Sequence, residues 1–276
     1  MAGLPFIKMH GLGNDFVIVD GRARTPALDP VWVRPEWVRT VADRRTGVGC
    51  DQLIVIGASD RADARIDIRN PDGGVAAACG NGTHCVAALL MSEGGAERVV
   101  IETLSGEVAC RRAGDDLVAA DMGPARLEWG DIPLAREAGT LALDLENDDL
   151  GAAVAVSMGN PHAVFFVADA EAVDLAALGP GIEHHPLFPD RTNVEVATAT
   201  APDRIRLRVW ERGTGITRAC GSGACATLVA AARRGLTGRA ADVVLDGGVL
   251  NIVWRDDGHV VMTGPHATSF HGVLDR

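Results

Sequence analysis

The chain has 276 residues, a formal net charge of −11 at pH 7 and a pI near 5.1. This acidic balance excludes a typical nucleic-acid-binding surface, because phosphate recognition needs clustered positive charge. The N-terminal residues lack the pattern of a secretory signal, and no apolar run approaches the roughly 18 residues of a membrane-spanning helix. We therefore expect a cytoplasmic protein with neither a nucleic-acid partner nor a membrane partner.

Short runs that alternate in polarity or are rich in β-branched residues predict strands along the whole chain. In chain order they are FIKMH, DFVIVD, DQLIVIG, ARIDIR, RVVIET, AVAVSM, HAVFFVAD, TNVEVAT, RIRLRVW, LNIVW and HVVMTG. Three helices are predicted between them, at about 35–46, 82–92 and 223–234. The last two are apolar nearly all round, so each is expected to be buried in the middle of a sheet.

The two apolar helices open in near copies of one segment, AACGNGTHCVAALL at 77–90 and TRACGSGACATLVAAA at 217–232. Cys79 and Cys220 lie 141 positions apart, and Gly123-Pro124 and Gly264-Pro265 keep that spacing. Upstream, Gly13-Asn14 and Gly159-Asn160 are 146 positions apart. The chain is therefore interpreted as two homologous halves rather than a single repeat-free domain.

The predicted fold class is α+β, with each half a mostly antiparallel curved sheet around a buried central helix and an active-site cleft between the halves. The first half is placed at 1–124 and carries Cys79, with the tail 266–276 docking back on it. The second half is placed at 125–265 and carries Cys220. The region 125–150 is loop-rich and is expected to hold the boundary.

Each repeated cysteine stands at a Gly-polar-Gly turn that opens a helix. The unpaired amides and positive dipole of a helix N-terminus can bind a carboxylate and lower a thiol pKa. Asn81 and Ser222 are expected to cap the helices. If both halves close on one carboxylate-bearing substrate, one thiolate can remove an α-hydrogen while the opposite thiol returns a proton. This pattern predicts a two-base racemase or epimerase.

The cofactor expectation depends on the lysine count. Many racemases use pyridoxal phosphate on a lysine Schiff base, but only Lys8 is a lysine among the 26 basic residues. Lys8 lies in an alternating strand and is interpreted as solvent-exposed. We therefore expect no cofactor, with preorganised dipoles in a closed site supplying the stabilisation.

Other interpretations of the cysteines remain open at this point. Duplication for stability alone would need no thiol chemistry, and buried thiols are often inert. Zinc binding by four thiolates has poor ligand spacing, so no metal is expected. The four residues of that alternative are Cys79, Cys85, Cys220 and Cys225. Cys50 and Cys110 lack the repeated context and are interpreted as inert, and Asp51 as structural.

Eight segments resemble motifs of the diaminopimelate epimerase family, and together they are far more specific than CGNG alone. They are KMHGLGNDF (8–16), GCDQ (49–52), RNPDG (69–73), ACGNG (78–82), MGNPH (158–162), RTNVE (191–195), ERGTGITRACGSGA (211–224) and MTGP (262–265). The resemblance implies a cofactor-independent isomerase that interconverts LL- and meso-diaminopimelate in lysine and peptidoglycan-precursor synthesis. It also implies a cytoplasmic homodimer.

The resemblance carries site residues over to matching positions. It implies that Cys79 and Cys220 are the catalytic pair and that His162 and Glu211 influence their protonation. Arg212 is suited to hold a distal carboxylate as a fork. The implied substrate contacts are Asn14, Gln52, Asn70, Gly80, Asn81, Asn160, Asn193, Glu211, Arg212, Gly221 and Ser222.

The chain also departs from the family pattern. Ser222 stands where threonine is common, and Ile216 replaces a frequent glutamate. The chain has no tyrosine, and Phe270 stands where many relatives place an aromatic residue of the subunit interface. The nearest alternative enzyme is a proline racemase or hydroxyproline epimerase, in which a histidine tends to occupy the position of Asn81. A noncatalytic amino-acid-binding or metal-binding module is the alternative from another class. Two thiols facing one carbon atom are further expected to form a disulfide when substrate is absent.

Overall fold

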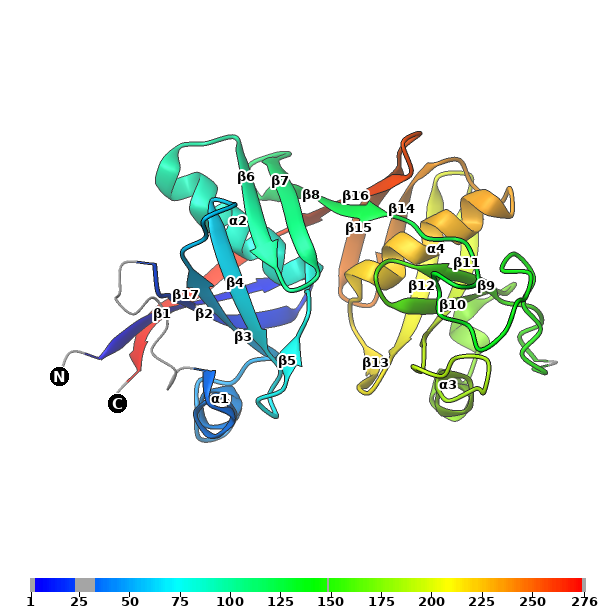
Figure 1. Ribbon diagram of the computed structural model, residues 1–276, viewed down its shortest axis with the longest axis horizontal. Helices are drawn as coiled ribbons and strands as arrows, with labels where there is room; N and C mark the ends of the chain where they lie inside the picture. The colour runs from blue at the N-terminus through cyan, green and yellow to red at the C-terminus, as the bar shows by residue number, and fades with distance from the viewer. Residues whose placement is uncertain (1–2, 23–32, 148, 275–276) are drawn as a thin grey trace. The chain divides into compact units, whose positions relative to one another are not determined.

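The computed structural model describes residues 3–22, 33–147 and 149–274. Contacts divide the chain into two compact units, Met1–Ala120 with Gly264–Arg276 and Asp121–Thr263. Figure 1 shows both units as sheet-rich bodies with few helices, which confirms the α+β class. Residues 275 and 276 of the expected docking tail lie outside the described residues.

The first unit is built mainly from strands that pair with their neighbours in the chain. Its elements are β1 (Leu4–Gly11), β2 (Asn14–Asp20), α1 (Pro35–Ala42), β3 (Gln52–Gly57), β4 (Ala64–Arg69), β5 (Val75–Ala76), α2 (Gly80–Gly94), β6 (Arg98–Thr103), β7 (Gly106–Arg112), β8 (Leu117–Pro124) and β17 (Ala267–Leu274). Strand β17 pairs antiparallel with β1, so the end of the chain joins this unit.

The second unit repeats the arrangement. Its elements are β9 (Val154–Ser157), β10 (Pro161–Phe166), η2 (Ala170–Ala172), α3 (Leu175–Glu183), β11 (Asn193–Ala201), β12 (Arg204–Glu211), β13 (Gly215–Thr217), α4 (Gly221–Arg233), β14 (Ala240–Leu245), β15 (Gly248–Trp254) and β16 (His259–Pro265). The boundaries between the two units fall within β8 and β16.

Strand pairing follows one scheme in both units. In the first, β2 and β3 are parallel, β3 and β4 antiparallel, and β4 and β6 parallel. In the second, β10 and β11, β11 and β12, and β12 and β14 reproduce this sequence. Every other pair with a described register is antiparallel, which supports the expectation of mostly antiparallel sheets in two homologous halves.

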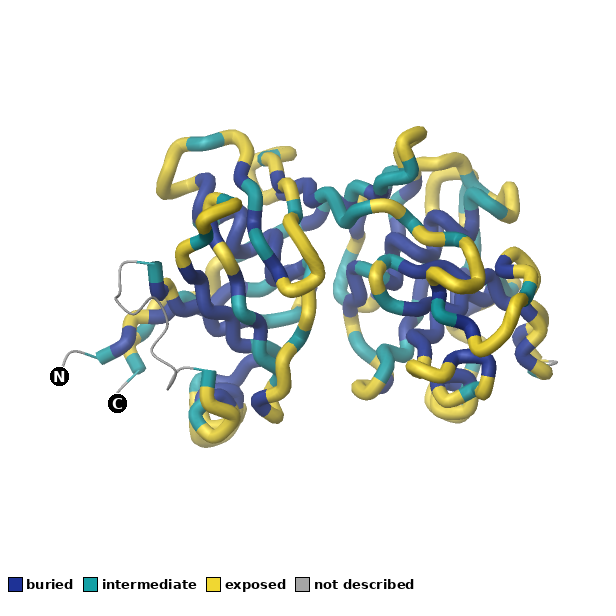
Figure 2. Tube along the Cα trace, in the orientation of Figure 1, coloured by how far each residue is buried: buried dark blue, intermediate teal, exposed yellow. Residues whose placement is uncertain are grey.

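The two apolar helices are the buried centres of their units. Ten of the 15 residues of α2 and ten of the 13 residues of α4 are buried (Figure 2). Helix α2 packs against β1, β6 and β7, and α4 packs against β9, β11 and β15. Burial of both helices is therefore confirmed, although each begins two residues before its predicted start.

The first predicted helix is shorter than expected. It ends at Ala42 instead of continuing to residue 46. Asp43 leaves the helical conformation, and its Oδ1 accepts hydrogen bonds from the backbone N–H groups of Arg45 and Thr46 at 2.8 and 2.7 Å. A side chain that binds the nearby backbone in this way offers an alternative to the helical bonds and ends the helix.

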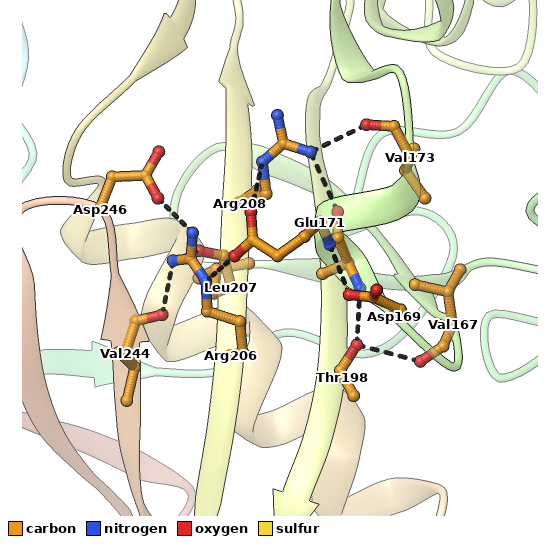
Figure 3. Close-up of polar contacts among 11 residues, drawn as sticks. Val167, Asp169, Glu171, Val173, Thr198, Arg206, Leu207, Arg208, Val244 and Asp246 are labelled. Atoms are coloured by element: carbon orange, nitrogen blue, oxygen red, sulfur yellow. Dashed lines mark hydrogen bonds and ion pairs between the residues drawn. The ribbon is translucent and has the colours of Figure 1, made fainter.

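Helix α3 and the 3-10 turn η2 were not predicted from the sequence. Pro180 lies inside α3, where it removes a backbone donor, and this masks the periodicity. Two arginines of β12 fix the neighbouring loops, as Figure 3 shows. The Arg206 Nε group donates to Glu171 Oε1 at 2.6 Å, and Arg208 Nη1 donates to the Val173 carbonyl at 2.8 Å.

The loop-rich region after β8 belongs to the core of the second unit. Between β8 and β9 the described residues form two isolated bridges, and no named helix or strand. Six apolar side chains of this region are nevertheless buried in the core cluster that contains Phe165 and Val194. They are Ile132, Leu134, Leu143, Leu145, Leu150 and Ala153. Across the described chain, no helix combines the length and apolar character required to span a membrane.

Candidate functional site

Cys79 occupies the N-cap of α2, with the extended backbone that such a position requires (φ −151°, ψ 110°). Its carbonyl accepts the Thr83 N–H at 2.8 Å and the Thr83 hydroxyl at 2.9 Å. The Cys79 Sγ lies 3.6 Å from Asn14 Oδ1, and Asn81 Nδ2 donates to the same oxygen at 3.5 Å. Asn14, Cys79 and Asn81 therefore meet at one helix N-terminus.

The amide of Asn14 is oriented from behind by a charged cluster. Its Nδ2 donates to Asp51 Oδ2 at 3.0 Å, which leaves its Oδ1 facing the thiol. Arg44 bridges the carboxylates of Asp15 and Asp51 at 2.6 and 2.8 Å, and Lys8 forms an ion pair with Asp15. Burial opposes ionisation of Asp15, but hydrogen bonds from Arg44 and Lys8 hold its pKa well below the usual range.

The sequence-based interpretation of Lys8 is wrong. Its side chain is buried, with 7% of the residue exposed, and it also donates to the Gly49 carbonyl. Strand β1 is covered by β2 and β17 on its two edges, and Asp15 supplies the neutralising charge.

Two further predicted residues of the first unit lie side by side. Gln52 Nε2 donates to Asn70 Oδ1 at 2.9 Å. The Gln52 Oε1 atom is buried and has no hydrogen-bond partner among the described residues. It therefore presents an acceptor without a protein donor.

Cys220 occupies the matching N-cap of α4 and is 6% exposed. Its Sγ accepts the Gly223 N–H at 3.4 Å and lies 3.6 Å from Ser222 Oγ. Burial, followed by the charges of Glu211 and Glu195, raises the Cys220 pKa well above its ordinary value. The expected lowering of the pKa by the helix N-terminus is therefore wrong for Cys220, because burial and two nearby carboxylates outweigh the dipole.

The predicted capping roles of Asn81 and Ser222 are also wrong. The cysteines themselves are the N-cap residues, and both polar side chains lie within the first helical turn. Asn81 instead donates to Asn14, and Ser222 Oγ accepts from Asn160 Nδ2 at 3.3 Å. Both side chains thus connect the thiol turn to the strand hairpin that precedes it in the chain.

A buried pair on adjacent strands lies beneath the Cys220 turn. His162 Nδ1 is 2.7 Å from Glu195 Oε1, and His162 Nε2 is 3.0 Å from Asn160 Oδ1. Both members of the pair are 0% exposed. Burial raises the Glu195 pKa, and the nearby His162 opposes this effect. Glu195 was not among the residues predicted from the sequence.

Glu211, Arg212 and Asn193 lie at the adjoining strand ends. Glu211 accepts a hydrogen bond from the Thr217 hydroxyl, and burial raises its pKa. The Asn193 amide is used internally, since it accepts the Arg212 N–H at 2.9 Å and donates to the Pro161 carbonyl at 3.0 Å. Asn193 therefore holds two backbone segments together through its amide oxygen and one amide N–H.

A polar pocket of about 320 Å³ opens beside these residues within the second unit. Asn160 and Arg212 line it together with Arg126 and Asp190, and its volume suits a small polar molecule. A larger hollow of about 640 Å³ is lined by Arg239 and Trp254 and contains none of the predicted site residues. We associate the smaller pocket with function because polar groups converge on it.

The remaining cysteines lie away from the thiol turns. Cys85 and Cys225 are 0% exposed in the middle of α2 and α4, and burial raises the pKa of both thiols. Burial also raises the Cys50 pKa to about 11. All six cysteines are in the described part of the chain, and none forms a disulfide. Within that part, no cluster of three or more His, Cys, Asp or Glu residues has metal-site geometry.

Comparison with known proteins assigns the chain to a family. The family model described as "Diaminopimelate epimerase" matches residues 6–128 and 154–268. The chain belongs to the diaminopimelate epimerase family. It is 58% identical over 273 residues to the diaminopimelate epimerase of Rhodospirillum centenum, covering 98% of this chain and 92% of that one. With the enzyme of Phenylobacterium zucineum the identity is 55%, covering 99% and 98%.

Solved structures share the fold at lower identity. A predicted epimerase from Pseudomonas aeruginosa has a TM-score of 0.69 and 18% identity, with 99% of each chain covered. A probable proline racemase from Agrobacterium radiobacter also gives 0.69 and 18%, covering 99% of this chain and 93% of that one. The fold is therefore common to several enzymes, whereas the high-identity relatives place this chain among the isomerases of lysine biosynthesis.

Proposed function

We propose that this chain interconverts LL- and meso-diaminopimelate by a cofactor-independent, two-thiol mechanism. The observation that carries the proposal is the repetition of one thiol turn. Cys79 and Cys220 occupy the N-caps of matching buried helices in two homologous units. A helix N-terminus binds a carboxylate, and a thiol beside it is placed to reach the adjacent α-carbon.

In this mechanism the two cysteines act on opposite faces of one α-carbon. One thiolate removes the α-hydrogen, and the other thiol donates a proton to the carbanion, so the centre inverts and the thiols exchange roles. The raised pKa of Cys220 favours its thiol form, which suits the proton donor. Glu211 and His162 adjust the protonation of the cysteines, and the fixed amides around the carboxylate stabilise the charge that develops.

The polar residues around the turns fit a substrate with an amino-acid group at both ends. The helix N-termini at Gly80-Asn81 and Gly221-Ser222 bind the reacting carboxylate. Arg212, in the polar pocket with Asn160, binds the distal carboxylate as a planar fork. The remaining proposed contacts are Asn14, Gln52, Asn70, Asn193 and Glu211. We also propose that the enzyme acts as a cytoplasmic homodimer and contributes to peptidoglycan precursors.

The test is proton NMR of LL-diaminopimelate in heavy water, with reduced protein freed of pyridoxal phosphate and treated with EDTA. The expected result is conversion to the meso isomer with deuterium at the α-carbon, lost in Cys79→Ala and in Cys220→Ala. Absence of exchange with the folded wild-type protein contradicts the proposal, and proline is then the next substrate to test.

A further inference from the structure

The space beneath the first turn of α2 is apolar. A Cβ atom added at Gly82 would lie 2.7 Å from Ile54 Cδ1 and 3.4 Å from Phe16 Cε1. Both residues come from the parallel pair β2–β3, in which Phe16 stands opposite Gln52 and Ile18 opposite Ile54. Two hydrocarbon side chains therefore fill the floor under the Cys79 turn.

The matching space beneath α4 holds a titratable pair. A Cβ atom added at Gly223 would lie 2.9 Å from Glu195 Oε1 and 3.2 Å from Cys220 Sγ. In the parallel pair β10–β11, His162 stands opposite Asn193 and Val164 opposite Glu195. By this register, His162 and Glu195 occupy the places that Phe16 and Ile54 hold in the first unit.

Packing alone does not account for the pair, because the first unit fills the same space with hydrocarbon. Glu195 is 0% exposed, and its Oε2 atom has no hydrogen-bond partner among the described residues. A buried, half-satisfied carboxyl group is unfavourable compared with the isoleucine at the matching position. Its presence in the second unit therefore points to a task at the Cys220 turn.

The contacts of the pair form a directed hydrogen-bond chain. When the Glu195 carboxyl donates its O–H to His162 Nδ1, 2.7 Å away, the neutral imidazole carries its proton on Nε2 and donates it to Asn160 Oδ1 at 3.0 Å. This fixes the amide so that Asn160 Nδ2 donates to Ser222 Oγ at 3.3 Å. The Ser222 hydroxyl is then left to donate to Cys220 Sγ, 3.6 Å away. Each link fixes the donor direction of the next.

We propose that Glu195 is a positioning residue for Cys220 that acts through His162, Asn160 and Ser222. It holds His162 in the form with a proton on Nε2, which orients the chain so that a hydroxyl donor faces the sulfur. No proton crosses the Asn160 amide. The hydroxyl donor favours the thiolate whenever Cys220 has given up its proton, and it opposes the burial and the carboxylate charges of Glu211 and, when ionised, Glu195, which disfavour that form.

The consequence of this role for catalysis rests on the proposed function, but its structural part can be measured separately. In the wild-type protein with ¹⁵N-labelled histidine, the imidazole signals of His162 are assigned by comparison with His162→Gln. The expected spectrum has a protonated Nε2 and an Nδ1 hydrogen-bonded to Glu195. A His162 with an unprotonated Nε2 would overturn the proposal, whether or not the substrate is correct.

Two variants then separate positioning from charge and from packing. Glu195→Ile copies the first unit and removes the Nδ1 partner. It is expected to lower kcat about 10- to 100-fold, the loss seen when the hydrogen-bond partner of a metal-ligating histidine is removed, with KM changed less than about threefold. Glu195→Gln can donate an amide N–H to Nδ1 and is expected to keep the Nε2–H signal and most of kcat. The matched control is Ile54→Val in the first unit, with kcat expected within about twofold of wild type.

The outcomes decide the proposal. A low kcat in Glu195→Ile with a changed His162 spectrum, together with rescue by glutamine, supports the positioning role. Unchanged kcat in Glu195→Ile, or equal losses in both folded variants, contradicts it. Loss of kcat with an unchanged His162 spectrum also contradicts it, because Glu195 would then act only as packing.

Discussion

The thiol turns of α2 and α4 have similar backbone conformations, but different side chains surround their sulfur atoms. At the first, Asn14 faces Cys79 and is braced by Asp51, while Phe16 and Ile54 fill the floor. At the second, Asn160 contacts Ser222 beside the sulfur of Cys220 and is braced by His162, with Glu195 beneath it. An asparagine that follows a Gly at the same point of the repeat is thus held by a carboxylate in one unit and by an imidazole in the other.

The duplication preserved the backbone of the thiol turns and left the side chains around them free to change. Helix N-cap geometry is set by the Cys-Gly-polar-Gly turn and is common to both units. Local electrostatics are set by side chains of the adjacent parallel strands, which differ at matching positions. Equivalent backbones therefore support two thiols with unequal surroundings.

The largest expected effect is loss of either thiol. Cys79→Ala and Cys220→Ala are each expected to lower kcat by about 10²- to 10⁴-fold, the usual contribution of a general acid or base. The matched controls are Cys85→Ala and Cys225→Ala, whose sulfur atoms are buried in the same two helices. Steady-state assays of all four variants test this comparison, and equal losses in the controls would contradict it.

The next largest effect is expected on stability, at the charged cluster behind Asn14 in the first unit. Asp15→Asn removes the carboxylate from the buried Lys8, and loss of one partner of a buried ion pair typically costs about 3–5 kcal/mol. We expect a corresponding fall in the free energy of unfolding, measured by urea denaturation. Lys8→Met, which leaves Asp15 paired with Arg44, should cost less, and the reverse order would refute this account.

The same cluster predicts that the free energy of unfolding falls at acidic pH. Because the Asp15 pKa is lower in the folded than in the unfolded chain, its contribution is complete above about pH 4, near the ordinary Asp value. It is lost as pH falls from there towards the folded pKa. Between pH 2 and 6, the free energy of unfolding should therefore depend more steeply on pH for wild type than for Asp15→Asn. Equal pH dependence in the two proteins would exclude this contribution.

A smaller effect distinguishes the floors of the two turns. Gly82→Ala directs its Cβ at the mobile end of Ile54, whereas Gly223→Ala directs it at a Glu195 oxygen held by His162 and at the Cys220 sulfur. We expect Gly223→Ala to cost about 1–3 kcal/mol of overpacking and also to lower kcat. Gly82→Ala should cost less and leave kcat closer to wild type. Thermal unfolding and kinetics on both variants check this order.

The smallest expected effect concerns Ser222. Ser222→Thr keeps the hydroxyl that accepts from Asn160, and kcat should stay within about twofold of wild type. Ser222→Ala removes that group and leaves the Asn160 amide without this acceptor, so kcat should fall further. Equal kcat values for the two variants would show that the hydroxyl is not used.

The sequence predicted most of the sheet and both central helices, because their signals are local. Strands such as β2 and β3 are continuous β-branched runs, and the apolar surfaces of α2 and α4 require burial. Strand β7 reads GEVACRR and α3 contains Pro180, so neither shows a clear period. The predicted helices began two residues late because the helix-opening glycines have low helical propensity.

Site prediction failed where burial depends on tertiary pairing. Lys8 has the pattern of a polar, outward-facing residue in an alternating strand, but in the structure it is buried and paired with Asp15. Glu195 stands in NVEVAT, where a single carboxylate resembles an outward-facing residue, yet it is fully buried. One signal was available, since the spacing of 141 between the thiol turns aligns Glu195 with Ile54 of an apolar strand.

The measurement that tests the two-thiol mechanism most directly is hydrogen isotope content at the α-carbon at low conversion in heavy water. We predict that the first product formed from LL-diaminopimelate, and from the meso isomer, carries deuterium at the inverted centre while remaining substrate keeps its hydrogen. That pattern requires the removed and the returned hydrogen to use different acid–base groups, which are the two thiols in the proposed mechanism. Product that retains the substrate's own α-hydrogen would indicate a single base and would contradict the account.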